Sequence, residues 1–274
     1  MQRLYNLSDD QTEYQINDRM SFMRFLGINL CEKVPDAKTI WKFKNDLAET
    51  ETVDKLFCMF DEHLENKGLI SHKGTIVDAT FVDAPRQRNS RDENKKIKNG
   101  VIPEEWEKPE NKSKLAQKDI DADWTKKNGE RHFGYKDHVK CDADSKLITN
   151  YSVTSASVHD SQRCLVFIGQ EDEVLYADSA YSGKPIALAL PENCKNQICE
   201  KGYRNSPLTS EQKMNNRRKS RIRCRIEHIF GFMTGAMHGI TIRSIGITRA
   251  WMNIGITNLV YNFCRYSYLK RASA

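Results

Sequence analysis

The first seventy residues carry apolar positions at the three- and four-residue spacing of amphipathic helices. The segment QTEYQINDRMSFMRFLG shows this spacing, and Ser8 and Gln11 at its start make the pattern of a capping box. The segments VPDAKTIWKFKNDLAE and TVDKLFCMFDEHLENKG repeat the spacing, and the last one ends at Gly68, a residue type that commonly ends helices. Three short helices in series predict an N-terminal helical module over residues 1–70.

The pattern then changes to the two-residue period of strands. GTIVDATFVDAP alternates so that Asp78 shares a face with Ile76 and Val82. HFGYKDHVKCD and KLITNYSVT, separated by a short turn, predict a hairpin, and EVLYADSAYSG predicts a short buried strand that ends at Asp178. A long helix is predicted over residues 219–233, and helical spacing returns in the tail ITRAWMNIGITNLVYNFCRYSYLKR.

These elements predict an α/β protein built on one mixed sheet. We assign the helical module to residues 1–70, the sheet domain to 71–240 and a C-terminal helical segment to 241–274. Residues 86–131 hold thirteen basic and ten acidic residues with little periodic apolar content. They predict a charged insertion, a loop or mobile segment with a helix near 114–124.

Charge is distributed unevenly along the 274 residues. The net charge is +6, but the segment from Gln212 to the end has twelve Lys and Arg against one acid, Glu227, and a net charge of +11. Residues 1–211 therefore carry −5. A basic segment of this kind suits contact with a nucleic-acid backbone. It equally suits a solvated basic helix that balances the acidic part of the same protein.

The cysteines and the N-terminus place limits on the class of protein. Eight Cys are scattered without a CxxC pair or a spacing typical of zinc sites, which favours reduced, mostly buried thiols. The chain has no run of eighteen apolar residues, and MQRLYNLSDDQTEYQ lacks the apolar core of a signal peptide. We therefore expect a soluble cytoplasmic protein.

Three carboxylates stand out as candidate metal ligands. Asp78 lies on an apolar strand face, where an unpaired charge is costly, and Asp178 ends a buried strand. Glu227 is the only acid of the C-terminal basic segment. Carboxylates on separate elements, without a His or Cys set, suit a hard divalent cation. Two such ions roughly 4 Å apart could hold the attacking and leaving oxygens of a phosphoryl transfer.

Each of these acids also has an ordinary structural interpretation. Asp78 could pair with a buried arginine, and Asp178 could cap the turn that follows it. Glu227 could pair with Arg223 one helical turn earlier. Spacing alone leaves the two interpretations open.

Five motifs in a fixed order give the more specific signal. GTIVDATFVDAP, DADWTKKNGERHFGYKDHVKCD, VTSASVHDS, YADSAYSG and RIRCRIEHIFG resemble the DDE transposases of bacterial insertion sequences, most of all the group named after insertion sequence five. LSDDQTEYQINDRMSFMRFLG, VPDAKTIWKF and SIGITRAWMNIGITNLVYN look like the same family. The resemblance therefore covers nearly the whole chain.

The resemblance implies a fold, a site and a reaction. Asp78, Asp178 and Glu227 match the catalytic DDE triad of an RNase H-like fold, which carries them on the first strand, after the fourth strand and on a late helix. The family uses Mg²⁺ or Mn²⁺, two ions in this interpretation, to cut at transposon ends, and the freed 3′-hydroxyl then attacks target DNA. The implied partners are terminal inverted repeats, target DNA and further copies of the chain, as a homodimer or higher oligomer.

Two departures from the family pattern lead to alternative functions. The wider superfamily places Tyr and Lys where this chain has Ser220 and Thr234. The resemblance therefore does not imply that these two residues contact DNA. The chain also begins close to the LSDDQ motif, which predicts a shortened end-recognition region. One alternative is a truncated, catalytically inactive DNA-binding protein derived from a transposase. Another is a structure-selective nuclease with the same fold.

The predicted DNA contacts lie on the basic helix and on one strand. They are Arg217, Arg218, Lys219, Arg221, Arg223, Arg225, Lys136 and His138. The two strand residues are expected to face solvent, where they also need no function.

Several further residues have two interpretations. His159 matches a His-Asp pair of the family and, with Arg223, is placed next to the metal site, whereas Asp160 is most simply a helix N-cap. Trp106 and Trp124 could stack on a base or anchor the insertion locally. The remaining pair, Asp142 and Asp144, is interpreted as turn residues.

Overall fold

The computed structural model describes residues 1–127 and 129–272. Its N-terminal part is helical, as predicted, and the capping box of Ser8 with Gln11 is present. The first predicted helix is divided in two, because Arg19 adopts an extended conformation with φ −116° and ψ 108°. The helices are α1 (Asp9–Asp18), α2 (Met20–Leu26), α3 (Ala37–Glu49) and α4 (Thr52–Asn66).

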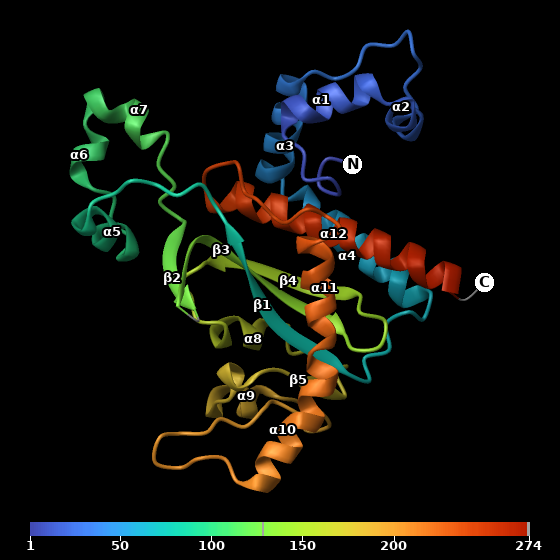
Figure 1. Ribbon diagram of the computed structural model, residues 1–274, viewed down its shortest axis with the longest axis vertical. Helices are drawn as coiled ribbons and strands as arrows, with labels where there is room; N and C mark the ends of the chain where they lie inside the picture. Colours follow the sequence, from blue (N-terminus) through green and yellow to red (C-terminus); the bar gives the residue numbers. More distant parts are fainter. Residues whose placement is uncertain (128, 273–274) are drawn as a thin grey trace.

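A mixed sheet forms the centre of the protein (Figure 1). Strand β1 pairs antiparallel with β3 on one side and parallel with β5 on the other, and β5 pairs parallel with β6. The opposite edge of β3 pairs first with β2 and then with β4. The strands are β1 (Thr75–Asp83), β2 (Asp123–Lys127), β3 (Glu130–Asp142), β4 (Ile148–Ser155), β5 (Val174–Tyr176) and β6 (Lys195–Asn196).

Gly134 allows β3 to bond three strands along its length. It pairs with Asp83 of β1 and with Asp123 of β2, at the point where β2 gives way to β4. Its φ is +144°, and a Cβ there would lie 2.3 Å from the Val82 carbonyl oxygen. Only glycine fits so close an approach of two backbones.

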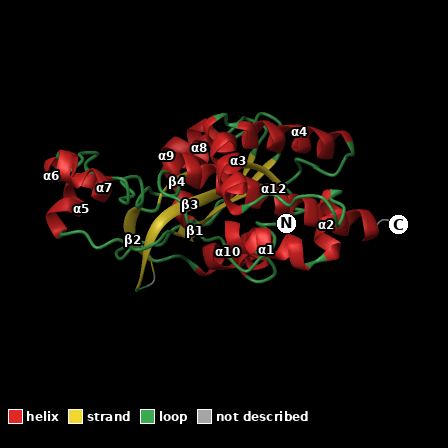
Figure 2. Ribbon diagram, turned by 90° about the horizontal axis from the view of Figure 1, so that it is seen from above, coloured by secondary structure: helices red, strands yellow, loops and turns green. Residues whose placement is uncertain are grey.

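Helices cover both faces of the sheet. Successive side chains of β1 point to opposite faces, as predicted, so β1 contributes to the core on each side. Ile76 and Val82 pack in one apolar core with residues of α11 and α12, whereas Val77 packs in a second core with α8 and α9. Figure 2 shows α8 and α9 on one side of the strands and α10 on the other. The bounds are α8 (Ser161–Phe167), α9 (Lys184–Ala189), α10 (Ser210–Arg223), α11 (Arg225–Thr234) and α12 (Ile247–Ala272).

The long C-terminal helix α12 is held to the sheet by buried amides as well as apolar contacts. Asn262 accepts a hydrogen bond from the Ile148 amide at 2.9 Å and donates to the Ile148 carbonyl at 2.7 Å, so it continues the bonding of β4. Asn258 donates to Asp137 of β3 at 3.1 Å. None of the helices in the described residues is long and apolar enough to cross a membrane.

The long helix predicted over residues 219–233 is wrong in its bounds. It consists of two helices that meet at Cys224, where ψ is −8°, and the first of them starts earlier, behind a capping box of Thr209 with Gln212. No Pro or Gly marks the break in the sequence. Arg225, the first residue after it, donates to the Ala143 carbonyl at 2.8 Å, a contact between distant parts of the chain.

The charged insertion 86–131 is more ordered than a loop. It forms α5 (Arg91–Lys98), α6 (Glu104–Glu107), the 3-10 helix η1 (Pro109–Asn111), α7 (Lys112–Leu115) and then β2. The helix predicted near 114–124 is therefore wrong, because α7 ends before most of it and Trp124 lies on a strand. Trp106 is fully buried and donates to Glu93 at 2.7 Å, which makes it the local anchor of the insertion.

Asp137 provides a test of the packing between the sheet and α12. It is fully buried, and burial raises its pKa to about 8, although the Asn258 amide favours the ionised form. The unfolded chain has an ordinary aspartate pKa of about 3.9. Between these values the folded state holds a proton that the unfolded state has lost. The free energy of unfolding therefore falls by about 1.4 kcal/mol per pH unit as pH rises through this window.

We expect Asp137→Asn to remove this part of the pH dependence, because asparagine keeps the shape without a titrating proton. Urea unfolding at pH 5, 6, 7 and 8 should show the variant gaining stability relative to wild type at each step. Asp46→Asn on exposed α3 is the matched control and should follow the wild-type curve. Parallel curves for Asp137→Asn and wild type would show that Asp137 is ionised in the folded protein.

Candidate active site

The three acids singled out in the sequence lie on adjoining elements. Asp78 is in the middle of β1, and Asp178 follows β5 directly. Since β1 and β5 are neighbouring parallel strands, the two aspartates lie at adjacent positions of the sheet. Glu227 is in the first turn of α11, and α11 packs on β1.

Arg223 joins two of the acids. Its Nη1 lies 3.0 Å from Asp78 Oδ2, and its Nη2 lies 3.0 Å from Glu227 Oε1. The Asp78 side chain is only 15% exposed, whereas that of Glu227 is 60% exposed. Arg223 therefore satisfies both structural interpretations from the sequence. It is the arginine that pairs with Asp78, and it is the partner of Glu227 one helical turn away.

Asp178 is held by the backbone that follows it. Its Oδ1 accepts a hydrogen bond of 2.6 Å from the Ala180 amide at the start of the 3-10 helix η2 (Ser179–Tyr181). The turn-capping interpretation of Asp178 is therefore correct. The second carboxylate oxygen is not used by this cap, so capping fixes the side chain and still leaves an oxygen to bind a cation.

Burial and neighbouring charge act in opposite directions on Asp78. The pKa of Asp78 is raised to about 6: burial is the largest cause and the charge of Asp178 adds to it, while the Ala79 amide and Arg223 act in the opposite direction. Burial opposes the charge on Arg223 as well, but the carboxylates of Asp78 and Glu227 raise its pKa. Arg223 therefore favours the ionised form of Asp78, the state in which a carboxylate binds metal.

The donor set fits a hard divalent cation. Asp78, Asp178 and Glu227 offer carboxylate oxygens, and two of them already lie within 3.0 Å of one cationic group. With Arg223 between two of them, the three acids are not as closely gathered as a ready metal cage. An ion that bound Asp78 and Glu227 together would have to displace the guanidinium from at least one of them.

Tyr181 is a neighbour of the acids that sequence reasoning missed. It is 1% exposed, and its hydroxyl has no hydrogen-bond partner among the described residues. Burial raises its pKa, as do the nearby charges of Asp78 and Asp160. Its position in YADSAYSG, three residues after Asp178, is the sequence feature that could have indicated that it lies near the acids.

Some basic side chains of the helix are exposed, and others are bonded to the rest of the protein. Arg217, Arg218 and Arg221 are exposed, and among the described residues none of them forms an ion pair. Lys219 instead donates to the Ile198 carbonyl at 2.9 Å, and Arg225 bonds to Asp144 at 2.9 Å. Three of the predicted DNA contacts are thus available at the surface.

Lys136 and His138 do not face solvent, which corrects the sequence interpretation. Both lie on the face of β3 that is covered by the loop before α8, and both are buried. Lys136 bonds to Asp160 at 2.8 Å, and His138 Nε2 lies 2.8 Å from Thr154 Oγ1. Burial lowers the pKa of His138 to about 4, so it is neutral at pH 7. This arrangement argues against a phosphate contact from either residue.

The remaining predicted residues take simpler roles. His159 is exposed and bonds to Ser161 at 2.8 Å, and within the described residues it forms no hydrogen bond or ion pair with the three acids. Asp160 occupies the N-cap position of α8, but its side chain bonds to Lys136 and not to the helix. Asp142 is a turn residue, as predicted, and accepts from the Ser145 amide at 2.7 Å.

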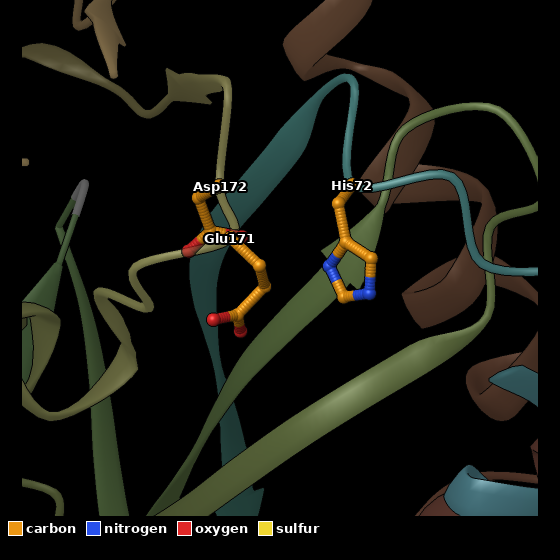
Figure 3. A group of neighbouring side chains, drawn as sticks. All are labelled: His72, Glu171 and Asp172. Carbon is orange, nitrogen blue, oxygen red and sulfur yellow. The ribbon is translucent and has the colours of Figure 1, made fainter. Parts of the chain in front are cut away.

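A second group of ionisable side chains lies at the far end of β1. His72, Glu171 and Asp172 place one ligand atom each within 4.8 Å of the others, and Figure 3 shows the Glu171 carboxylate between the other two. Lys140 offsets one of the two negative charges of this group, since its Nζ lies 2.9 Å from Asp172 and 3.8 Å from Glu171. Asp172 also accepts from Thr75 at 2.7 Å. We interpret Asp172 and Lys140 as a buried ion pair that joins β1, β3 and the loop before β5.

Comparison with known families agrees with the geometry. The family model described as Transposase DDE domain matches residues 70–263, which include all three acids. The model described as Transposase domain (DUF772) matches residues 1–46, which lie within the N-terminal helices. No solved structure matches the chain.

The contact of Arg223 with two acids can be tested by titration. In Arg223→Gln the pKa of Asp78 should rise above about 6, because the guanidinium that favours its ionised form is lost. Carboxyl ¹³C chemical shifts of Asp78 followed from pH 4 to 9 measure this directly. Arg221→Gln, which removes an exposed arginine of the same helix, is the control and should leave the titration unchanged. An unchanged pKa in Arg223→Gln would mean that the guanidinium does not set the charge of Asp78.

Proposed function

The chain belongs to the transposase DDE domain family, and on this premise we propose that it cuts DNA at the ends of an insertion sequence and joins the freed ends to target DNA. Membership of the family implies DNA binding and nuclease or transferase chemistry. The observation that carries the finer proposal is that Arg223 bonds to both Asp78 of β1 and Glu227 of α11. Asp178, which follows the neighbouring strand β5, lies close enough for its charge to raise the pKa of Arg223. The order of the motifs supports the group named after insertion sequence five.

The strand order supports an RNase H-like catalytic domain. If β2 is counted with the insertion 86–131, the strands of the domain are β1, β3, β4, β5 and β6. Asp78 then lies on the first strand, Asp178 follows the fourth, and Glu227 lies on a late helix. This is the layout expected from the resemblance to DDE transposases.

Asp78, Asp178 and Glu227 are the residues that would hold Mg²⁺ or Mn²⁺, two ions in this proposal. When bound, the ions would activate the attacking oxygen and stabilise the leaving one. The chain itself positions the ligands: pairing of β1 with β5 sets the spacing of the aspartates, and the Ala180 amide orients Asp178. Arg223 bonds to both Asp78 and Glu227 and favours the ionised form of Asp78.

We place the DNA backbone along α10. Arg217, Arg218 and Arg221 are exposed on the helix that leads directly to Arg223 and Glu227, so phosphates bound there would approach the acids. Such contacts give affinity without sequence information. We extend the proposal to a homodimer or higher oligomer on DNA, because an element has two ends and each chain offers one set of acids.

The proposal is tested by replacing each acid with its uncharged isostere. Asp78→Asn, Asp178→Asn and Glu227→Gln should each lower cleavage of the element's terminal repeats more than about 100-fold, since each removes a metal ligand. Binding of the same DNA should remain within about threefold of wild type. Cleavage and joining are read on labelled repeats with Mg²⁺, with Mn²⁺ and with EDTA.

An exposed acid of α10 provides the matched control. Glu211→Gln, in the first turn of that helix, removes a carboxylate away from the three acids and should cut and join normally. Wild-type cleavage by any of the three acid variants contradicts the assignment. Wild-type protein that binds the repeats but never cuts them would instead indicate a catalytically inactive DNA-binding protein, and cleavage without joining would indicate a nuclease.

A further inference from the structure

The insertion 86–131 forms a groove that lies away from α10. In Figure 1 its helices α5, α6 and α7 lie together beside β2, away from α10. The groove runs between α5 and β2 and has a volume of about 570 Å³. Its main side chains are Arg91, Lys95, Lys98, Trp124, Lys126 and Arg131.

The α5 wall presents its cations on one face. Arg91, Lys95 and Lys98 are separated by four and three residues, so they share a side of the helix, and all three are exposed. At 1.5 Å per residue they span about 10 Å along the helix axis. One strand of DNA carries a phosphate about every 3.4 Å along its axis, so this length matches about three phosphates.

The opposite wall is a strand pair with the same character. Trp124 and Lys126 are two residues apart on β2, and Arg131 is the partner of Lys126 on β3, so all three side chains share a face. Lys126 and Arg131 are exposed. Trp124 is half-buried, packs on Phe133 and lies under the Arg86 guanidinium at 5.8 Å.

The cations of the groove are not paired with acids among the described residues. In the part of the chain that the structure describes, none of the five groove cations forms an ion pair. Glu93 of α5 bonds instead to Trp106 and to the Ser90 amide, and these bonds, the Ser90 amide first, lower its pKa to about 2. Asp123, the one acid of the lining, accepts from the Trp124 amide at 2.6 Å.

The α5 wall is also fixed in position. Glu93 ties α5 to Trp106, which is fully buried at the centre of the insertion, and Lys114 and Lys118 lie over its ring at 5.5 and 5.0 Å. The cations therefore stand on a supported helix that faces a second, strand-built wall. A fixed array of unpaired positive charge with a half-buried indole between its walls suits a polyanion that also has flat, apolar parts.

We propose that this groove, here called the insertion groove, binds the sugar-phosphate backbone of one DNA strand, with Trp124 against its sugars or bases. The proposal rests on the proposed function, because it takes the DNA of a transposase as the ligand. It adds a second DNA surface, built by the insertion and separate from α10. The strand belongs either to a duplex or to a single-stranded segment, and the two have the same backbone chemistry.

The test uses DNA of mixed sequence, because phosphate contacts need no particular site. Fluorescence anisotropy with a labelled 30-base-pair duplex, and with one of its single strands, gives the affinity of the full chain in EDTA at several salt concentrations. The triple variant Arg91→Ala/Lys95→Ala/Lys98→Ala should bind at least about tenfold more weakly. Its plot of log affinity against log salt should be flatter by about 2.7 on duplex, or by about 2.1 on single strand.

A second variant, on the other wall, tests whether the loss of binding comes from the groove or only from a change in α5. Lys126→Ala/Arg131→Ala should flatten the same plot by about 1.8 on duplex, or by about 1.4 on single strand. Whichever DNA shows these changes is the form that the insertion groove holds. Thermal melting of both variants should match wild type, because all five side chains are exposed.

The matched control removes three exposed lysines of the insertion that do not line the groove. Lys96→Ala/Lys108→Ala/Lys112→Ala has the same change in net charge and should keep most of the wild-type salt dependence. If the groove variants bind both DNAs with wild-type affinity and salt slope, the insertion groove is not a DNA site, and the proposed function still stands. An equal loss of affinity in the control variant would lead to the same conclusion. Wild-type protein that binds neither DNA overturns the proposed function as well.

Discussion

The burial of one carboxylate on an otherwise apolar sheet face determines how the candidate active site is assembled. Asp78 shares its face of β1 with Ile76 and Val82, and its charge needs a partner there. Arg223 supplies it from the end of α10 and reaches Glu227 at the same time. Docking of the two helices on the sheet and assembly of the acids are therefore one event, stabilised by the same guanidinium.

Buried polar groups fix the surroundings of this site as well. Asn262 completes the hydrogen bonds of β4, Lys136 joins β3 to Asp160, and Lys140 joins it to Asp172. Each contact is satisfied only in one register of strand and helix, since a buried polar group without its partner is costly. The apolar cores supply most of the stabilisation, and these bonds decide which arrangement of the elements is adopted.

Several local signals in the sequence were reliable, whereas features that depend on contacts between distant residues were missed. The capping box of Ser8 and the face of Asp78 follow from neighbouring residues and were predicted correctly. The break at Cys224 and the burial of Lys136 and His138 depend on residues far along the chain, so no local pattern marks them. The three acids were found from motif order; their meeting around Arg223 depends on the pairing of β1 with β5 and the packing of α11.

The joint at Cys224 separates two tasks that a continuous helix would link. In one unbroken helix, any change in the orientation of the segment with Arg217 and Arg218 would also change the orientation of the segment with Glu227. Here the joint follows Arg223 directly, so everything beyond it is oriented by its own contacts with the sheet. Substitutions at Arg217 and Arg218, before the joint, can therefore accumulate without changing the orientation of α11, the helix that carries Glu227.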